Sequence, residues 1–164
     1  MYINHNYKVG FVHNPKTGGS ALLKALPFLG LDGPKHGKSI KLPSNYFIFS
    51  FVRNPYQRLV SYYRFQIHKR PERVNYDWYK DFYSFITIET NKYIIKQSDL
   101  ITPELNIYQY EELEEAHKHI CNKLNCKYVS LARNENTLYF GDYDWKQYMT
   151  KEALEFINDF CDAE

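Results

Sequence analysis

The chain has 164 residues, 44% of them hydrophobic and 24% charged, so it is long enough to bury a core as one domain without metal or disulfide staples. A formal net charge of +2 is too small for a protein that coats nucleic acid, so any anion binding must be local. The three cysteines show no CxxC spacing and indicate neither a zinc site nor a disulfide framework. Because no signal-peptide pattern and no apolar run of about 18 residues is visible, we expect a cytoplasmic protein without a membrane span.

A loop with two glycines near the start of the chain is the first candidate site. An apolar run over Val9–Val12 is followed by a turn, by the loop Lys16–Ser20 and by apolar residues at helical spacing, which predicts a strand, a loop and a helix. Glycines let the backbone approach a bound group, and a helix start attracts an anion such as phosphate or sulfate. Lys16 adds a positive charge to this loop, and Thr17 and Ser20 add hydroxyl donors.

A second unit of the same kind begins at Tyr46–Val52. Its nearly continuous apolar character predicts a central strand that is covered on both faces, as in parallel α/β sheets. Arg53 follows at the strand end, and Asn54 can cap a helix whose first residue is a proline. Ser61, on that helix, can offer a hydroxyl to an anion that Arg53 holds. A structural salt bridge for Arg53, and a bond from Ser61 to its own backbone, are the alternatives.

The remaining pattern predicts five further elements. They are an amphipathic helix over Tyr76–Ile86, a short strand around Leu105–Tyr110, a helix over Glu111–Leu124, a last strand over Lys127–Ala132 and a final helix capped by Thr150.

The two strand–loop–helix units resemble the cofactor motifs of one enzyme family. An NTPase P-loop places its lysine after the second glycine, whereas Lys16 precedes both glycines. The segment Pro15–Ser20 instead resembles the 5′-phosphosulfate loop of sulfotransferases that use 3′-phosphoadenosine 5′-phosphosulfate (PAPS). The segment Phe51–Tyr63 resembles their 3′-phosphate motif, with an arginine at the strand end and a serine eight residues later. The chain therefore resembles PAPS-dependent sulfotransferases, and among them the carbohydrate-modifying type.

The resemblance implies a fold, a donor and a set of binding residues. The fold would be α/β, a three-layer P-loop-like sulfotransferase fold with a mainly parallel central sheet between helices, in a single domain over residues 1–164. The donor would be PAPS, with PAP as the product and no metal. The residues implied for donor binding are Pro15, Lys16, Thr17, Gly18, Gly19 and Ser20 at the sulfated end, Arg53 and Ser61 at the 3′-phosphate, and Arg133 on a loop returning over the nucleotide.

The resemblance also implies a catalytic base. His36 lies in the interval where carbohydrate-type sulfotransferases carry a histidine, and its near-neutral reference pKa suits the removal of a proton from the acceptor hydroxyl. An exposed loop histidine is the alternative role for His36. His13 is the main rival for the base, and a carboxylate among Glu111, Glu112, Glu114 and Glu115 is less favoured. Lys16 would stabilise the charge that develops as PAP leaves.

We therefore expect an enzyme that moves a sulfuryl group from PAPS to an acceptor hydroxyl by in-line displacement. The acceptor would be a glycan or a small alcohol, while its identity and the oligomeric state cannot be read from the sequence. A catalytically inactive module that binds PAP or PAPS is the first alternative. A small-molecule kinase ranks lower, because no Walker B-like apolar run ending in Asp is present.

Overall fold

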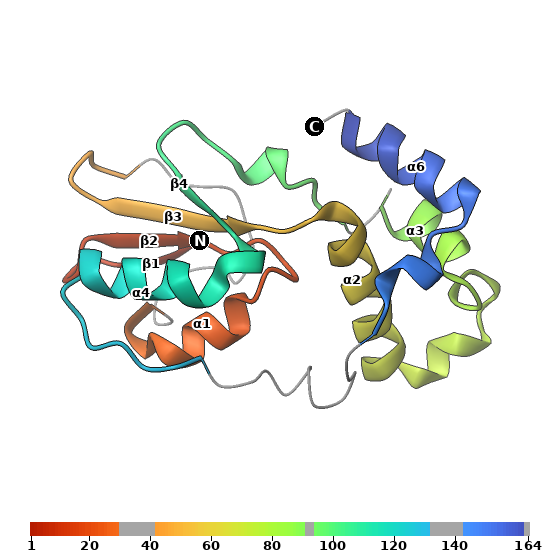
Figure 1. Cartoon of the computed structure of the whole chain (residues 1–164), viewed down its shortest axis with the longest axis horizontal. Coiled ribbons are helices and arrows are strands. Elements are labelled where there is room, and N and C mark those ends of the chain that lie inside the picture. Colours follow the sequence, from red (N-terminus) through yellow and green to blue (C-terminus); the bar gives the residue numbers. More distant parts are fainter. Residues whose placement is uncertain (30–41, 91–93, 132–142, 163–164) are drawn as a thin grey trace. The chain divides into compact units, whose positions relative to one another are not determined.

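The computed structural model describes residues 1–29, 42–90, 94–131 and 143–162 (Figure 1). The chain divides into two compact units. Unit 1 contains the described residues up to Arg53 and those from Gln97 to Leu131, and unit 2 contains those from Asn54 to Lys96 and the C-terminal segment. The single domain expected from the sequence stays a prediction. None of the described helices combines the length and the apolar character needed to cross a membrane.

Unit 1 is built on a four-stranded sheet in the order β1-β2-β3-β4 (Figure 1). The strands are β1 (Tyr2–Asn4), β2 (Val9–Val12), β3 (Phe47–Val52) and β4 (Asn106–Gln109). β2 pairs with β3 and β3 with β4 in parallel, while β1 pairs with β2 in antiparallel orientation. The predicted α/β class with a mainly parallel sheet is confirmed, and β1 is an edge strand that the sequence did not predict.

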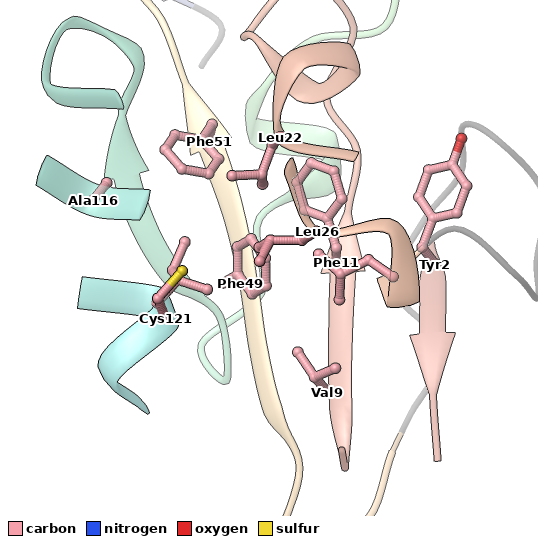
Figure 2. Close-up of a cluster of buried hydrophobic side chains, with 11 residues drawn as sticks. Tyr2, Val9, Phe11, Leu22, Leu26, Phe49, Phe51, Ala116 and Cys121 are labelled. Atoms are coloured by element: carbon pink, nitrogen blue, oxygen red, sulfur yellow. The ribbon is translucent and has the colours of Figure 1, made fainter. Parts of the chain in front are cut away.

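One face of this sheet carries the core of unit 1 (Figure 2). Helices α1 (Gly19–Ala25) and α4 (Leu113–Lys123) pack there against Phe11, Phe49 and Phe51, which are fully buried. Phe49 and Phe51 are two residues apart on β3 and therefore share a face of the sheet. The ring of Phe11, on β2, stacks with that of Phe49, and their centroids lie 5.0 Å apart. Each such ring contributes about 1.5–3 kcal/mol through its burial. The three-layer, P-loop-like arrangement stays a prediction.

Unit 2 is helical. Its helices are α2 (Pro55–Lys69), α3 (Phe82–Glu89) and α6 (Lys151–Asp162), and they surround a second cluster of buried apolar side chains. The two predicted caps are confirmed: Asn54 accepts a hydrogen bond from the backbone N–H of Gln57 at 3.3 Å, and Thr150 accepts one from that of Ala153 at 3.2 Å. Short 3₁₀ helices in the two units lie at Pro27–Leu29, Pro71–Asn75, Asp77–Tyr79, Ser98–Leu100, Tyr110–Glu112 and Trp145–Tyr148.

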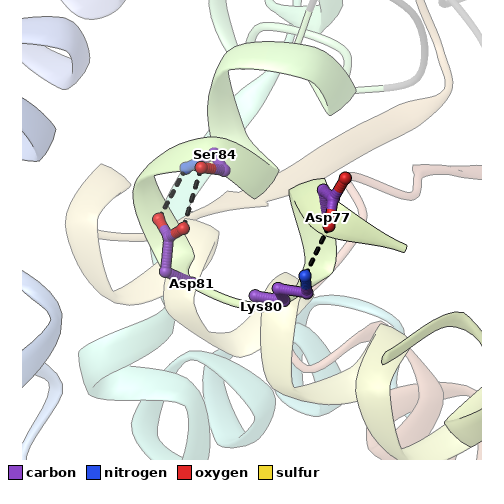
Figure 3. Close-up of polar contacts among 4 residues, drawn as sticks. All are labelled: Asp77, Lys80, Asp81 and Ser84. Atoms are coloured by element: carbon purple, nitrogen blue, oxygen red, sulfur yellow. Dashed lines mark hydrogen bonds and ion pairs between the residues drawn. The ribbon is translucent and has the colours of Figure 1, made fainter. Parts of the chain in front are cut away.

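The predicted helix over Tyr76–Ile86 is wrong in its first half. The α-helical part begins at Phe82, because Asp81 has an extended backbone and caps the helix instead of continuing it. The carboxylate of Asp81 accepts hydrogen bonds from the backbone N–H and from the hydroxyl of Ser84, each at 2.8 Å (Figure 3). The amphipathic pattern therefore spans a 3₁₀ turn and an α-helix.

The predicted strand over Lys127–Ala132 is also wrong for the residues that the structure describes. Residues 127–131 belong to no strand, and Ala132 lies outside the described residues. The side chains of Tyr128 and Leu131 pack against the core cluster of unit 1, and the Tyr128 ring lies 5.2 Å from that of His117. These apolar residues cover the core and do not extend the sheet.

Removing the Asp81 cap tests the start that the structure assigns to α3. We expect Asp81→Ala to lower the free energy of unfolding by about 1 kcal/mol, because two donors of Ser84 lose their acceptor. Asp77→Ala is the matched control, since Asp77 forms an exposed ion pair with Lys80 (Figure 3) and such surface pairs contribute little. Urea unfolding measures both variants; equal stability of the two would contradict the assigned cap.

Candidate active site

The carboxyl ends of β2 and β3 lie at the same edge of the sheet. The two strands are parallel and in register up to Val12 and Ser50, so the Lys16–Ser20 loop and Arg53 leave the sheet side by side. Open α/β sheets bind their ligands at this edge. The parallel pairing thus brings together the two motifs that the sequence predicted to cooperate.

Arg53 is held in a defined orientation. Its Nη1 donates a hydrogen bond to the backbone carbonyl of Lys16 at 3.2 Å, and its guanidinium lies 4.1 Å from the centre of the Tyr110 ring. Among the described residues no carboxylate pairs with Arg53, so the alternative of a structural salt bridge finds no support there. Its Nε is buried and has no hydrogen-bond partner within the described residues. Arg53 thus keeps a donor that no described residue uses.

Lys16 is a half-buried cation beside Arg53. Burial, and next the positive charge of Arg53, lower the pKa of Lys16 from 10.5 to about 8. Its backbone has a positive φ of 69°, which is uncommon for a residue with a side chain. A bound anion would offset the repulsion between the two cations and restore a higher pKa to Lys16.

The two glycines are required by the packing of the loop. Gly18 has a φ of +79°, and a Cβ there would lie 2.7 Å from Leu113 and 3.1 Å from the Tyr110 ring. A Cβ on Gly19 would lie 2.2 Å from the ring of His13. The loop therefore packs directly on protein side chains.

The other residues of the first motif differ in their exposure. Thr17 is fully buried and donates its hydroxyl hydrogen to the carbonyl of Asn14 at 2.8 Å, so this hydrogen is used within the loop. Ser20 is exposed and Pro15 is half-buried. His13 is 7% exposed, and its ring lies 5.5 Å from that of Phe11, which favours a supporting role over that of a base.

Two buried amides complete the site, and sequence reasoning missed both of them. Asn14 donates from Nδ2 to the carbonyl of Phe51 at 3.2 Å and to Oε1 of Gln97 at 3.0 Å. Gln97 also bonds both backbone groups of Arg53, accepting from its N–H and donating to its carbonyl, each at 2.9 Å. Gln97 lies in a stretch without a motif, and no sequence signal marked it. Tyr110 follows β4 directly, and only its aromatic ring at a strand end could have drawn attention to it.

Several predicted residues are not placed at this site by the structure. Ser61 is half-buried in α2, which belongs to unit 2, and its role at the site of unit 1 stays a prediction. His36 and Arg133 lie outside the described residues. Glu111 and Glu112 are exposed just before α4. In the part of the chain that is described, no group of three or more side chains could hold a metal ion.

Comparison with known proteins gives one match. A family model described as the sulfotransferase family matches residues 30–155, which is more than half of the chain. The matched segment contains Arg53 and Ser61 and begins after the Lys16–Ser20 loop. No curated protein and no solved structure matches the chain.

The depressed pKa of Lys16 predicts a cost in stability. The unfolded chain binds this proton more tightly than the folded one, so charged Lys16 destabilises the fold at pH 7, and the penalty is lifted as the pH rises from about 8 to about 10.5. We expect Lys16→Met to raise the free energy of unfolding by roughly 1–2 kcal/mol at pH 7, after allowance for solvent screening, and by less at pH 10.

Urea unfolding of both proteins at the two pH values measures this difference. Lys24→Met, at an exposed position of α1, is the control and should show no such pH-dependent gain. A Lys16→Met variant that is less stable than the wild type at pH 7 would contradict the assigned environment of Lys16.

Proposed function

Because the chain belongs to the sulfotransferase family, whose members transfer a sulfuryl group from PAPS to a hydroxyl acceptor, we propose that the Lys16–Ser20 loop and Arg53 form its donor site. The observation that carries this proposal is the direct contact between the two motifs, in which the Arg53 guanidinium donates to the carbonyl of Lys16. Both cations lie on one sheet edge within unit 1, so one nucleotide can reach both.

The charges of the site suit a polyanionic donor. Burial, and next the charge of Arg53, lower the pKa of Lys16, and the phosphate and sulfate groups of PAPS would offset both effects. Arg53 would bind the 3′-phosphate with the planar fork of its guanidinium, which Tyr110 already orients. Ser61 would add a donor to the same phosphate, and Arg133, from outside the described residues, would approach the 3′-phosphate or the adenine.

Lys16 and a base would assist sulfuryl transfer in two different ways. The acceptor oxygen forms a bond to sulfur while the bond between sulfur and the bridging oxygen of the phosphate breaks, in an in-line displacement with a loose transition state. Lys16 would stabilise the charge that develops on the bridging oxygen, and His36 would take the proton of the acceptor hydroxyl. These charges and the backbone donors of the loop would neutralise the leaving group without a metal.

The acceptor that we propose is a hydroxyl of a glycan or of a small alcohol. The motif resemblance to carbohydrate-type enzymes supports a glycan, although fold and family alone do not set the substrate. An inactive donor-binding module is the competing function, and it would bind PAP without transferring sulfate to any acceptor. Membership of the sulfotransferase family argues against a kinase.

Alanine variants of the two cations test the donor site. With labelled PAPS and a panel of glycans and alcohols, we expect Lys16→Ala to lower the turnover number roughly 100- to 1000-fold, as for the loss of one oxyanion donor. Arg53→Ala should mainly weaken PAP binding in calorimetry, by roughly 10- to 100-fold, because it removes charged hydrogen bonds. Lys24→Ala, on the surface of α1, is the control. Full transfer activity in Lys16→Ala would refute the role given to Lys16.

A pH profile tests the base. We expect His36→Ala to lower the transfer rate and to remove the fall in rate below about pH 6.5, because that limb reports protonation of the base. His68→Ala is the control, since His68 is exposed at the end of α2. If His36→Ala keeps the wild-type rate from about pH 6 to about pH 9, the base is another group, such as His13 or a carboxylate.

A further inference from the structure

We propose that Gln97 is a positioning residue for sulfuryl transfer, and that its buried side-chain amide sets the separation between the Lys16–Ser20 loop and Arg53. This inference rests on the proposed donor site and goes beyond it, because Gln97 belongs to neither cofactor motif. Gln97 is 7% exposed, and its amide joins two segments that are far apart in the sequence.

On one side, Gln97 extends the sheet beyond the end of β3. The last residue pair of β3 and β4 is Val52 with Gln109, so the backbone of Arg53 has no strand partner in that ladder. The side chain of Gln97 takes this place, since Oε1 accepts from the N–H of Arg53 and Nε2 donates to its carbonyl. A strand residue makes the same two bonds with its partner in an antiparallel pair. The backbone that carries the Arg53 side chain is thereby fixed.

On the other side, Gln97 reaches the glycine loop through Asn14. The pairing of β2 with β3 ends at Val12 and Ser50, and beyond it the two chains are joined by side chains. Asn14 donates to both the Phe51 carbonyl and Oε1 of Gln97. The carbonyl of Asn14 accepts the hydroxyl of Thr17, which belongs to the loop itself. A continuous set of hydrogen bonds thus runs from Arg53 through Gln97 and Asn14 to the loop.

The chemistry of these bonds requires a neutral amide at position 97. Oε1 accepts two hydrogen bonds while Nε2 donates one to a carbonyl, so the residue must supply both an acceptor and a donor. A methionine has a similar length but can make none of these bonds. A glutamate keeps the acceptor, loses the donor while it is ionised, and regains a donor when it is protonated. A carboxylate would also place a negative charge beside the two cations that are to bind the donor.

Binding and turnover of Gln97→Met test the proposal. PAP affinity is measured by calorimetry and sulfate transfer with labelled PAPS, at a temperature well below the melting point of each protein. We expect PAP binding to weaken about tenfold or more and the turnover number to fall as well, because both the loop and Arg53 lose their common support. Gln147→Met is the matched control, since Gln147 is exposed in the last 3₁₀ helix, and it should behave as the wild type.

A second variant separates positioning from simple support of the fold. For Gln97→Glu, whose side chain has the same shape, we expect a weaker affinity for PAP than that of the wild type at pH 8, measured well below the melting point of the variant, because the ionised carboxylate cannot donate to the Arg53 carbonyl and competes with PAP for the two cations. Wild-type affinity of Gln97→Glu for PAP at pH 8 would overturn the assigned hydrogen bonds. This variant also carries the test if Gln97→Met fails to fold.

The outcomes distinguish this inference from the function on which it rests. If the wild type does not bind PAP, the proposed donor site fails and the role of Gln97 fails with it. If the wild type binds PAP, while Gln97→Met melts at a lower temperature but keeps wild-type affinity and turnover, Gln97 only supports the fold and the inference alone is overturned.

Discussion

The placement of two cations side by side at one edge of the sheet is the feature on which the candidate site of unit 1 depends. The parallel pairing of β2 with β3 delivers Lys16 and Arg53 to one edge of the sheet, where the Arg53 guanidinium donates to the Lys16 carbonyl. Partial burial and this neighbouring charge lower the pKa of Lys16 to about 8. The lowered pKa of Lys16 costs stability in the free protein, and the proposed polyanionic donor would offset this cost.

Aromatic side chains and amides contact the loop and Arg53. The loop packs through Gly18 on Leu113 and Tyr110 and through Gly19 on the ring of His13, where an added methyl group would come too close. Amides join the loop to the end of β3. Gln97 bonds both backbone groups of Arg53, the residue that follows this strand. A carboxylate in the place of one of these amides would pair with a cation and compete with the proposed donor.

The parts that the sequence could predict are those with a short-range signal. The apolar runs of β2 and β3, the Asn54 cap and the two motifs each lie within about a dozen residues, and the structure confirms these strands and this cap. Gln97 could not be found in this way, because its partners are up to 83 positions away in the sequence. A local pattern gave a wrong prediction where tertiary packing decides the structure. Residues 127–131 have a strand-like composition, but they belong to no strand and pack on the core. The fold class was accessible from the sequence, whereas the support of the site was not.

Proton uptake on PAP binding is the most direct test of the central claim, which is that one anion binds to both Lys16 and Arg53. At pH 8 the Lys16 amine is about half protonated in the free protein, and a bound anion would charge it fully. Calorimetry of PAP binding in two buffers with different ionisation enthalpies should therefore give an uptake of about half a proton, and Lys16→Met should give none. Tight binding of PAP at pH 8 without any proton uptake by the wild type would contradict the claim.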